Sequence, residues 1–64
     1  MPNREYDIFE KLPDGTLLWR AVIRGLENTL TELKKFGEQS QNELLAIHTP
    51  TKQTIARVNV QNPE

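Results

Sequence analysis

Two stretches near the start of the chain carry closely spaced apolar residues, and in a strand the second stretch would place apolar side chains on both faces. The first, residues 6–12 (YDIFEKL), is rich in aromatic and β-branched side chains, and the second, LLWRAVIR, ends at about residue 24. Both patterns predict β-strands. Between them, Pro13, Asp14 and Gly15 suit successive positions of a tight turn that ends in a left-handed bulge residue. The pattern therefore predicts a β-hairpin.

The turn also predicts which residues of the two strands face each other. If Leu12 lies opposite Thr16, then Phe9 faces Trp19 and Ile8 faces Arg20. Uninterrupted alternation then divides the hairpin into two faces. One face holds Phe9, Leu17, Trp19, Ala21 and Ile23, and the other holds Tyr6, Ile8, Leu18 and Val22, diluted by Glu10 and Arg20.

The period changes after Gly25. Leu26, Leu30, Leu33 and Phe36 recur at helical spacing, which predicts one amphipathic helix. We expect this helix to continue past Gly37 to about residue 40, although Gly37 is also a suitable helix end.

Two more apolar stretches follow the helix, at residues 42–49 (NELLAIHT) and 54–60 (TIARVNV), with a turn at PTKQ between them. They predict a second hairpin. The chain is thus expected to be an α+β protein of order ββαββ, a single domain over residues 1–64 with an ordered core at about 5–60 and frayed polar termini. One helix packs on a four-stranded, mostly antiparallel sheet, and strand order 2-1-3-4 makes every neighbouring pair antiparallel.

A single helix covers only one face of such a sheet. We expect it over Phe9, Trp19, Ala21 and Ile23, because that face is more apolar and Ala21 permits close approach. The opposite face then exposes an apolar area larger than soluble monomers usually tolerate. This predicts a homodimer, formed through the sheet face or an edge strand, or the docking of an unidentified protein partner. The predicted interaction surface consists of Tyr6, Ile8, Leu18, Arg20 and Val22.

A second interpretation of the same face is that no partner covers it. In a twisted sheet, the aliphatic stems of Glu10, Arg20 and Arg57 would shield the apolar atoms.

Composition narrows the function classes. The chain has eight Lys and Arg against nine Asp and Glu, a net charge of −1, and no cysteine. The sequence lacks the basic stripe that is typical of nucleic-acid-binding proteins, and it lacks the cysteines that a disulfide or zinc fold requires. No stretch of it has the length and apolar character of a membrane span or a signal peptide. We therefore expect a cytoplasmic protein that does not bind a membrane, and the charge balance weighs against nucleic acid as its partner.

Candidate catalytic residues are sparse. His48 is the only histidine and Ser40 the only serine, and neither has the neighbours in sequence that a metal site or an activated nucleophile requires. Asp7 and Glu10 differ in parity, so they point to opposite faces and do not form an acid–base pair. We expect no catalytic residue, metal or cofactor, and hence no enzyme.

A nucleic-acid or small-ligand binding domain is the alternative. It would use Tyr6 for stacking and Arg20, Arg24 and Arg57 for charge. The net charge of −1 weighs against the nucleic-acid form of this alternative.

The segments YDIF, PDG, LWRAVIRGLENTL and NELLAIHTPTKQTIARV together form a hairpin with a Trp in its second strand, a Gly-Leu-Glu helix start and a second hairpin. In this plan the chain resembles small uncharacterised bacterial proteins of the domain-of-unknown-function type with ββαββ order. The resemblance spans nearly the whole chain and implies no activity and no catalytic residue.

Overall fold

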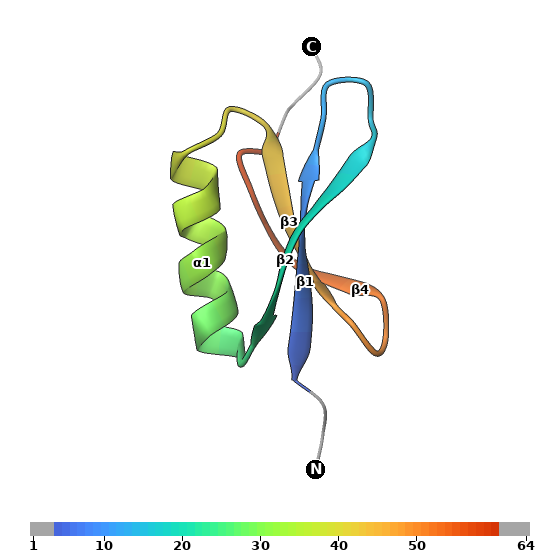
Figure 1. Cartoon of the computed structure of the whole chain (residues 1–64), viewed down its shortest axis with the longest axis vertical. Coiled ribbons are helices and arrows are strands. Elements are labelled where there is room, and N and C mark those ends of the chain that lie inside the picture. The colour runs from blue at the N-terminus through green and yellow to red at the C-terminus, as the bar shows by residue number, and fades with distance from the viewer. Residues whose placement is uncertain (1–3, 61–64) are drawn as a thin grey trace.

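The computed structural model describes residues 4–60 and confirms the α+β class and the order ββαββ (Figure 1). The elements are β1 (Glu5–Lys11), β2 (Leu17–Arg24), α1 (Leu26–Glu38), β3 (Glu43–His48) and β4 (Gln53–Val58). The polar termini expected to fray, residues 1–4 and 61–64, lie outside the described residues except for Arg4.

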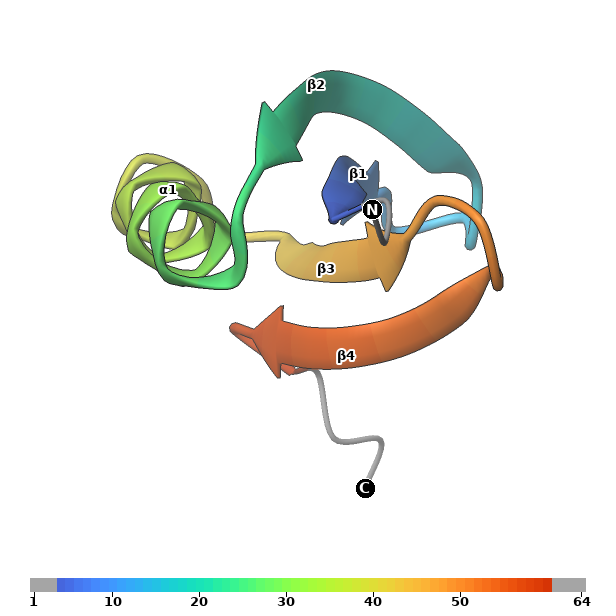
Figure 2. The same ribbon diagram turned by 90° about the horizontal axis from the view of Figure 1, so that it is seen from below.

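The four strands form one antiparallel sheet in the predicted order β2-β1-β3-β4. Figure 2 shows β2 and β4 at the two edges, β1 and β3 between them, and α1 to one side of the sheet. Each edge strand therefore has one side without a neighbouring strand among the described residues.

The first hairpin turns as its sequence predicts. The Leu12 N–H donates to the Thr16 carbonyl and the Gly15 N–H donates to the Leu12 carbonyl, both at 2.8 Å. Gly15 has φ of 90°, a conformation that side chains disfavour, and Asp14 accepts a hydrogen bond from the Thr16 N–H at 2.9 Å. Leu12 therefore lies opposite Thr16, as expected.

A β-bulge then interrupts the predicted alternation. Phe9 lies opposite Trp19 as expected, but the register shifts at the next residue, and Ile8 lies opposite Ala21 instead of Arg20. Arg20 is the additional residue of β2. Such an extra residue reverses the orientation of every side chain that follows it. Ala21 and Ile23 consequently lie on the same face as Tyr6 and Ile8.

This shift decides which face α1 covers, and the prediction that α1 covers Phe9 and Trp19 is wrong. Ile8 is fully buried under the helix, and its cross-strand neighbours on either side are Ala21 and Ala46. Ala56 follows Ala46 on β4. Three alanines beside one isoleucine leave room for a helix to approach closely. The expected close approach at Ala21 thus occurs on this face. The hydrophobic core consists of Ile8, Leu33, Leu44 and Ala46, flanked by Ile23, Phe36, Ala56 and Val58.

The helix continues through Gly37, as expected, and ends at Glu38, two residues short of the predicted end. Gly37 lies against β4, and a Cβ atom at this position would be only 2.7 Å from Val58 Cγ2. At the other end, the Thr29 hydroxyl donates to the Gly25 carbonyl at 2.6 Å. The helix thus contacts the sheet closely at its last turn, where only glycine fits.

Candidate interaction surface

Strand β2 carries the largest group of exposed apolar side chains on any element. Leu17, Leu18, Trp19 and Val22 are 48%, 46%, 54% and 52% exposed. They are four of the eight large apolar side chains that are exposed among residues 4–60. Natural edge strands usually carry charged residues or proline that discourage pairing with other chains. On β2 only Arg20 and Arg24 are charged. Val22 lies between these two arginines, and the other exposed apolar residues precede Arg20.

The second part of the candidate surface is the outer face, which we define as the face of the sheet turned away from α1. Its apolar members are Phe9, Leu17, Trp19, Val22, Leu45 and Ile47. Among the polar contacts on it are those of Asp7, which accepts hydrogen bonds from Trp19 Nε1 at 3.2 Å and from the Thr49 hydroxyl at 2.9 Å. The indole N–H is thus satisfied within the face, and the exposed part of the ring is apolar.

The backbone of β2 presents the same residues to the open edge. The Gly25 N–H donates to the Arg4 carbonyl at 2.9 Å, and Leu12 pairs with Thr16 at the other end of the hairpin. Hydrogen-bonded and non-bonded pairs alternate along an antiparallel ladder. Counting inward from both ends, the β2 residues whose backbone N–H and C=O groups point away from β1 are Leu17, Trp19, Val22 and Arg24. Three of these four also carry exposed apolar side chains on the outer face.

The structure divides the five residues of the predicted interaction surface. Tyr6 and Ile8 are 7% and 0% exposed, so the prediction that they lie on the uncovered face is wrong. Leu18 and Val22 are exposed but lie on opposite faces, because the bulge separates them. Arg20 points towards α1. The β2 bulge is the common cause of these differences.

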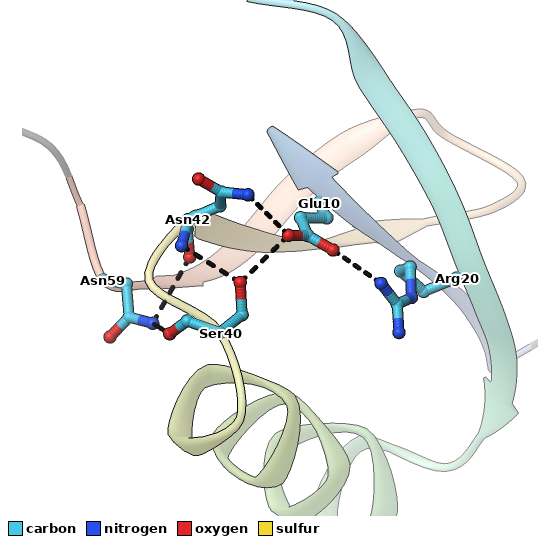
Figure 3. A network of polar contacts seen from close by, with 5 residues as sticks. All are labelled: Glu10, Arg20, Ser40, Asn42 and Asn59. Atoms are coloured by element: carbon cyan, nitrogen blue, oxygen red, sulfur yellow. Dashed lines mark hydrogen bonds and ion pairs between the residues drawn. The ribbon is translucent and has the colours of Figure 1, made fainter. Parts of the chain in front are cut away.

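Arg20 belongs to a network of polar residues beside the end of α1 (Figure 3). Its guanidinium lies 2.6 Å from Glu10 Oε1 and stacks 5.4 Å from the centre of the Phe36 ring. The other oxygen of Glu10 accepts hydrogen bonds from the Ser40 hydroxyl at 2.9 Å and from the Asn42 amide at 2.7 Å. These two hydrogen bonds, Asn42 first and then Ser40, together with the charge of Arg20, lower the pKa of Glu10 below its ordinary value despite burial.

Asn59 completes this network from the end of β4. Its side-chain amide donates to the carbonyls of Gly37 and Ser40 at 2.8 Å and 2.9 Å, and to that of Asn42 at 3.3 Å. Asn59 has φ of 55°, a left-handed conformation that asparagine tolerates better than most residues. The network therefore ties the segment between α1 and β3 to β1, to β2 and to the residue that follows β4. Both carboxylate oxygens of Glu10 accept hydrogen bonds from residues of the network, which indicates a structural role for Glu10.

The residues of the binding alternative do not gather into one site. Tyr6 is buried, with its ring centroid 5.2 Å from that of His48. Arg24 lies 3.5 Å from Glu5 and Arg57 lies 3.8 Å from Glu43, so each of these arginines, like Arg20, has a carboxylate neighbour. An open depression of about 430 Å³ does lie between the first turn and the α1–β3 segment, but none of these four residues lines it. Its lining is Lys11, Leu12, Pro13, Gly15, Gln41, Asn42 and Glu43.

The other candidate chemical groups are placed as follows. His48 Nδ1 lies 2.8 Å from the Thr51 hydroxyl, and Ser40 Oγ accepts a hydrogen bond from the Asn42 N–H at 3.0 Å. Within residues 4–60, no three histidine, aspartate or glutamate side chains come together as metal ligands would. In the same part of the chain, no helix has both the length and the apolar character needed to cross a lipid bilayer.

Sequence reasoning missed Phe9 and Trp19 as members of the open surface, because it assigned them to the core. One signal was available. Asp7 and Lys11 lie on the same face of β1 as Phe9, so a helix over that face would cover two charged residues of β1. A helix over the other face covers only one, Glu10. Burying an unpaired charge is costly, and that cost favours the face that the helix covers in the structure.

Comparison of the chain with protein-family models, with curated proteins and with solved structures gave no match.

Proposed function

We propose that this protein is a non-catalytic interaction module that self-associates through the edge strand β2. The observation that carries the proposal is the concentration of exposed apolar side chains on one edge strand, where Leu17, Leu18, Trp19 and Val22 are all about half exposed. An exposed apolar edge strand is a template for pairing with another chain.

The small size of the core supports the same proposal. Among residues 4–60, the fully or almost fully buried apolar side chains are Tyr6, Ile8, Leu33, Leu44 and Ala46. Domains of this length bury a smaller share of their surface than larger ones, and association is one of the ways in which they gain stability. A second copy paired along β2 would lie against the exposed apolar side chains of that strand.

Sedimentation velocity at micromolar concentration tests the proposal. We expect the native chain to sediment with twice the 7.4 kDa mass of one chain. The Val22→Glu variant places a carboxylate in the centre of the exposed β2 surface and should sediment as a single chain with an unchanged circular dichroism spectrum. Thr54→Glu is the matched control, because Thr54 is also exposed and β-branched but lies on β4. It should leave the dimer intact.

Two results would refute the proposal. One is a native chain that sediments as a 7.4 kDa species at these concentrations. The other is a Val22→Glu variant that remains folded and still forms the dimer.

A further inference from the structure

The open edge of β2 has an unequal spacing of backbone groups. The residues whose N–H and C=O groups point outward are Leu17, Trp19, Val22 and Arg24, so the steps between them are two, three and two residues. The middle step is longer because Arg20 is the extra residue of the bulge. The spacing is the same when it is counted in either direction along the strand.

This spacing selects the strand that fits the edge. A regular strand presents its outward groups at every second residue, so it would lose register with β2 on one side of the bulge. A second β2 in antiparallel orientation has the same long step at the same place. All four outward residues then meet outward residues, but only in the register that sets Trp19 opposite the partner's Val22.

We infer that two copies of this chain pair antiparallel along β2 in this single register, with the two-fold axis between Arg20 and Ala21, forming a continuous eight-stranded sheet. The inference rests on the proposed self-association and names its geometry. Closed dimers with a two-fold axis use the same patch of both copies, and this edge is self-complementary in that sense.

The side chains that meet in this register are compatible. On the outer face, Trp19 lies beside the partner's Val22, which is an aromatic and β-branched pair of the kind that stabilises sheets. On the other face, Leu18 lies beside the partner's Ile23. Leu17 lies beside the aliphatic stem of the partner's Arg24. Each of the four exposed apolar residues of β2 thus gains a neighbour that lies against it.

The charges also permit the pairing. Arg20 lies 2.6 Å from Glu10 of its own chain, and Arg24 lies 3.5 Å from Glu5. Each cation on β2 therefore brings its own carboxylate to the interface, and like charges directly opposite one another are avoided in this register. The net charge of −1 adds little long-range repulsion between two copies.

Disulfide cross-linking between two single-cysteine variants tests the register, because the native chain has no cysteine. Leu17→Cys and Arg24→Cys change two exposed residues, and the Arg24 side chain is 85% exposed. In the inferred register the two positions are opposite each other, with Cα atoms about 5.5 Å apart, which lies within the range of a disulfide. Two copies of the same variant would instead hold their cysteines roughly 23 Å apart along the strands.

We expect an equimolar mixture of the two variants to form covalent dimers under mild oxidation, and each variant alone to remain uncross-linked. A mixture of Leu17→Cys with Thr54→Cys is the control and should also remain uncross-linked. If the native chain sediments as a dimer but the Leu17→Cys and Arg24→Cys mixture does not cross-link selectively, the inferred register is overturned while self-association stands. If the native chain sediments as a monomer, the proposed function itself fails, and the inference fails with it.

Discussion

Trp19 Nε1 donates a hydrogen bond to Asp7 Oδ1 at 3.2 Å across the first hairpin, on the face of the sheet opposite the helix. This contact holds the only tryptophan of the chain on the outer face, where the residue is 54% exposed. Its ring is the central apolar group of the proposed interface. Trp19 is therefore a natural reporter of the proposed interface.

The fluorescence of Trp19 should depend on protein concentration. An indole that is half exposed in one copy becomes less hydrated when the partner's Val22 covers it, so the emission maximum should move to shorter wavelength as concentration rises through the dimerisation range. The shift should be absent in Val22→Glu, which retains Trp19 and is expected to remain a single chain. Emission spectra over a dilution series measure this effect, and a native spectrum that does not change while sedimentation shows a dimer would place Trp19 outside the interface.

The two faces of the sheet should respond differently to the same small truncation. Ile8 is fully buried under α1, whereas Ile47 is half-buried on the outer face. Ile8→Val should lower the free energy of unfolding by about 0.5–1.5 kcal/mol, the usual cost of removing one methyl group from a core. Ile47→Val should cost less. Urea denaturation of both variants, made in the Val22→Glu background to keep dimerisation out of the measurement, checks this prediction. An equal or larger loss for Ile47→Val would contradict the covered face.

Stability should fall on the acid side because of Glu10. The hydrogen bonds from Asn42 and Ser40 and the charge of Arg20 lower the pKa of Glu10 in the folded state. A carboxyl with a lowered folded pKa stabilises the fold above its unfolded pKa, about 4.3, and this stabilisation is lost as the pH falls through the folded pKa. Urea midpoints should therefore decline below about pH 4.5.

The Glu10→Gln variant isolates this contribution. It should be less stable than the native chain at pH 7 and should lose less stability between pH 7 and pH 3. Asp14, whose pKa is lowered by hydrogen bonds from the Thr16 backbone and side chain, remains in the variant and keeps part of the slope. A variant with an unchanged acid slope would show that Glu10 does not contribute to it.

Gly37→Ala should destabilise the fold, contrary to the usual effect of this substitution in a helix. Alanine normally stabilises a helix interior by about 0.5–1 kcal/mol relative to glycine. Here the new Cβ would lie 2.7 Å from Val58 Cγ2, and overpacking of this kind costs about 1–3 kcal/mol. Urea denaturation should show a net loss of roughly 1 kcal/mol. Val58→Ala removes the methyl group that causes the clash. The double variant Gly37→Ala/Val58→Ala should therefore be no less stable than Val58→Ala alone.

Local signals were sufficient to predict the order of elements, the first turn and the strand order. The turn depends on Pro13, Asp14 and Gly15, which are adjacent in sequence, and the helix depends on a four-residue apolar stripe. The strands of each hairpin pair antiparallel, and the order 2-1-3-4 is one that makes the two hairpins meet antiparallel as well. These features need no knowledge of contacts between distant residues.

The covered face could not be predicted in this way, because it depends on one inserted residue. The bulge at Arg20 forms where Arg20 reaches Glu10 and Phe36, and these contacts bring together three elements. The network around Glu10 was missed for a similar reason, since Ser40 and Asn42 are 30 and 32 residues away from it in sequence. The predicted interaction surface inherited this error, so that it kept Leu18 and Val22 and included the buried Tyr6 and Ile8.

The position of Asn59 sets a boundary for protein engineering. Its single side chain serves as the hydrogen-bond donor for backbone carbonyls on both sides of the α1–β3 connection, although it follows the last strand. The shortest fragment expected to fold therefore extends through Asn59, and a fusion partner or tag should be joined after this residue. A fragment that ends at Val58 would retain every strand but would lose the hydrogen bonds that Asn59 donates at the end of the helix.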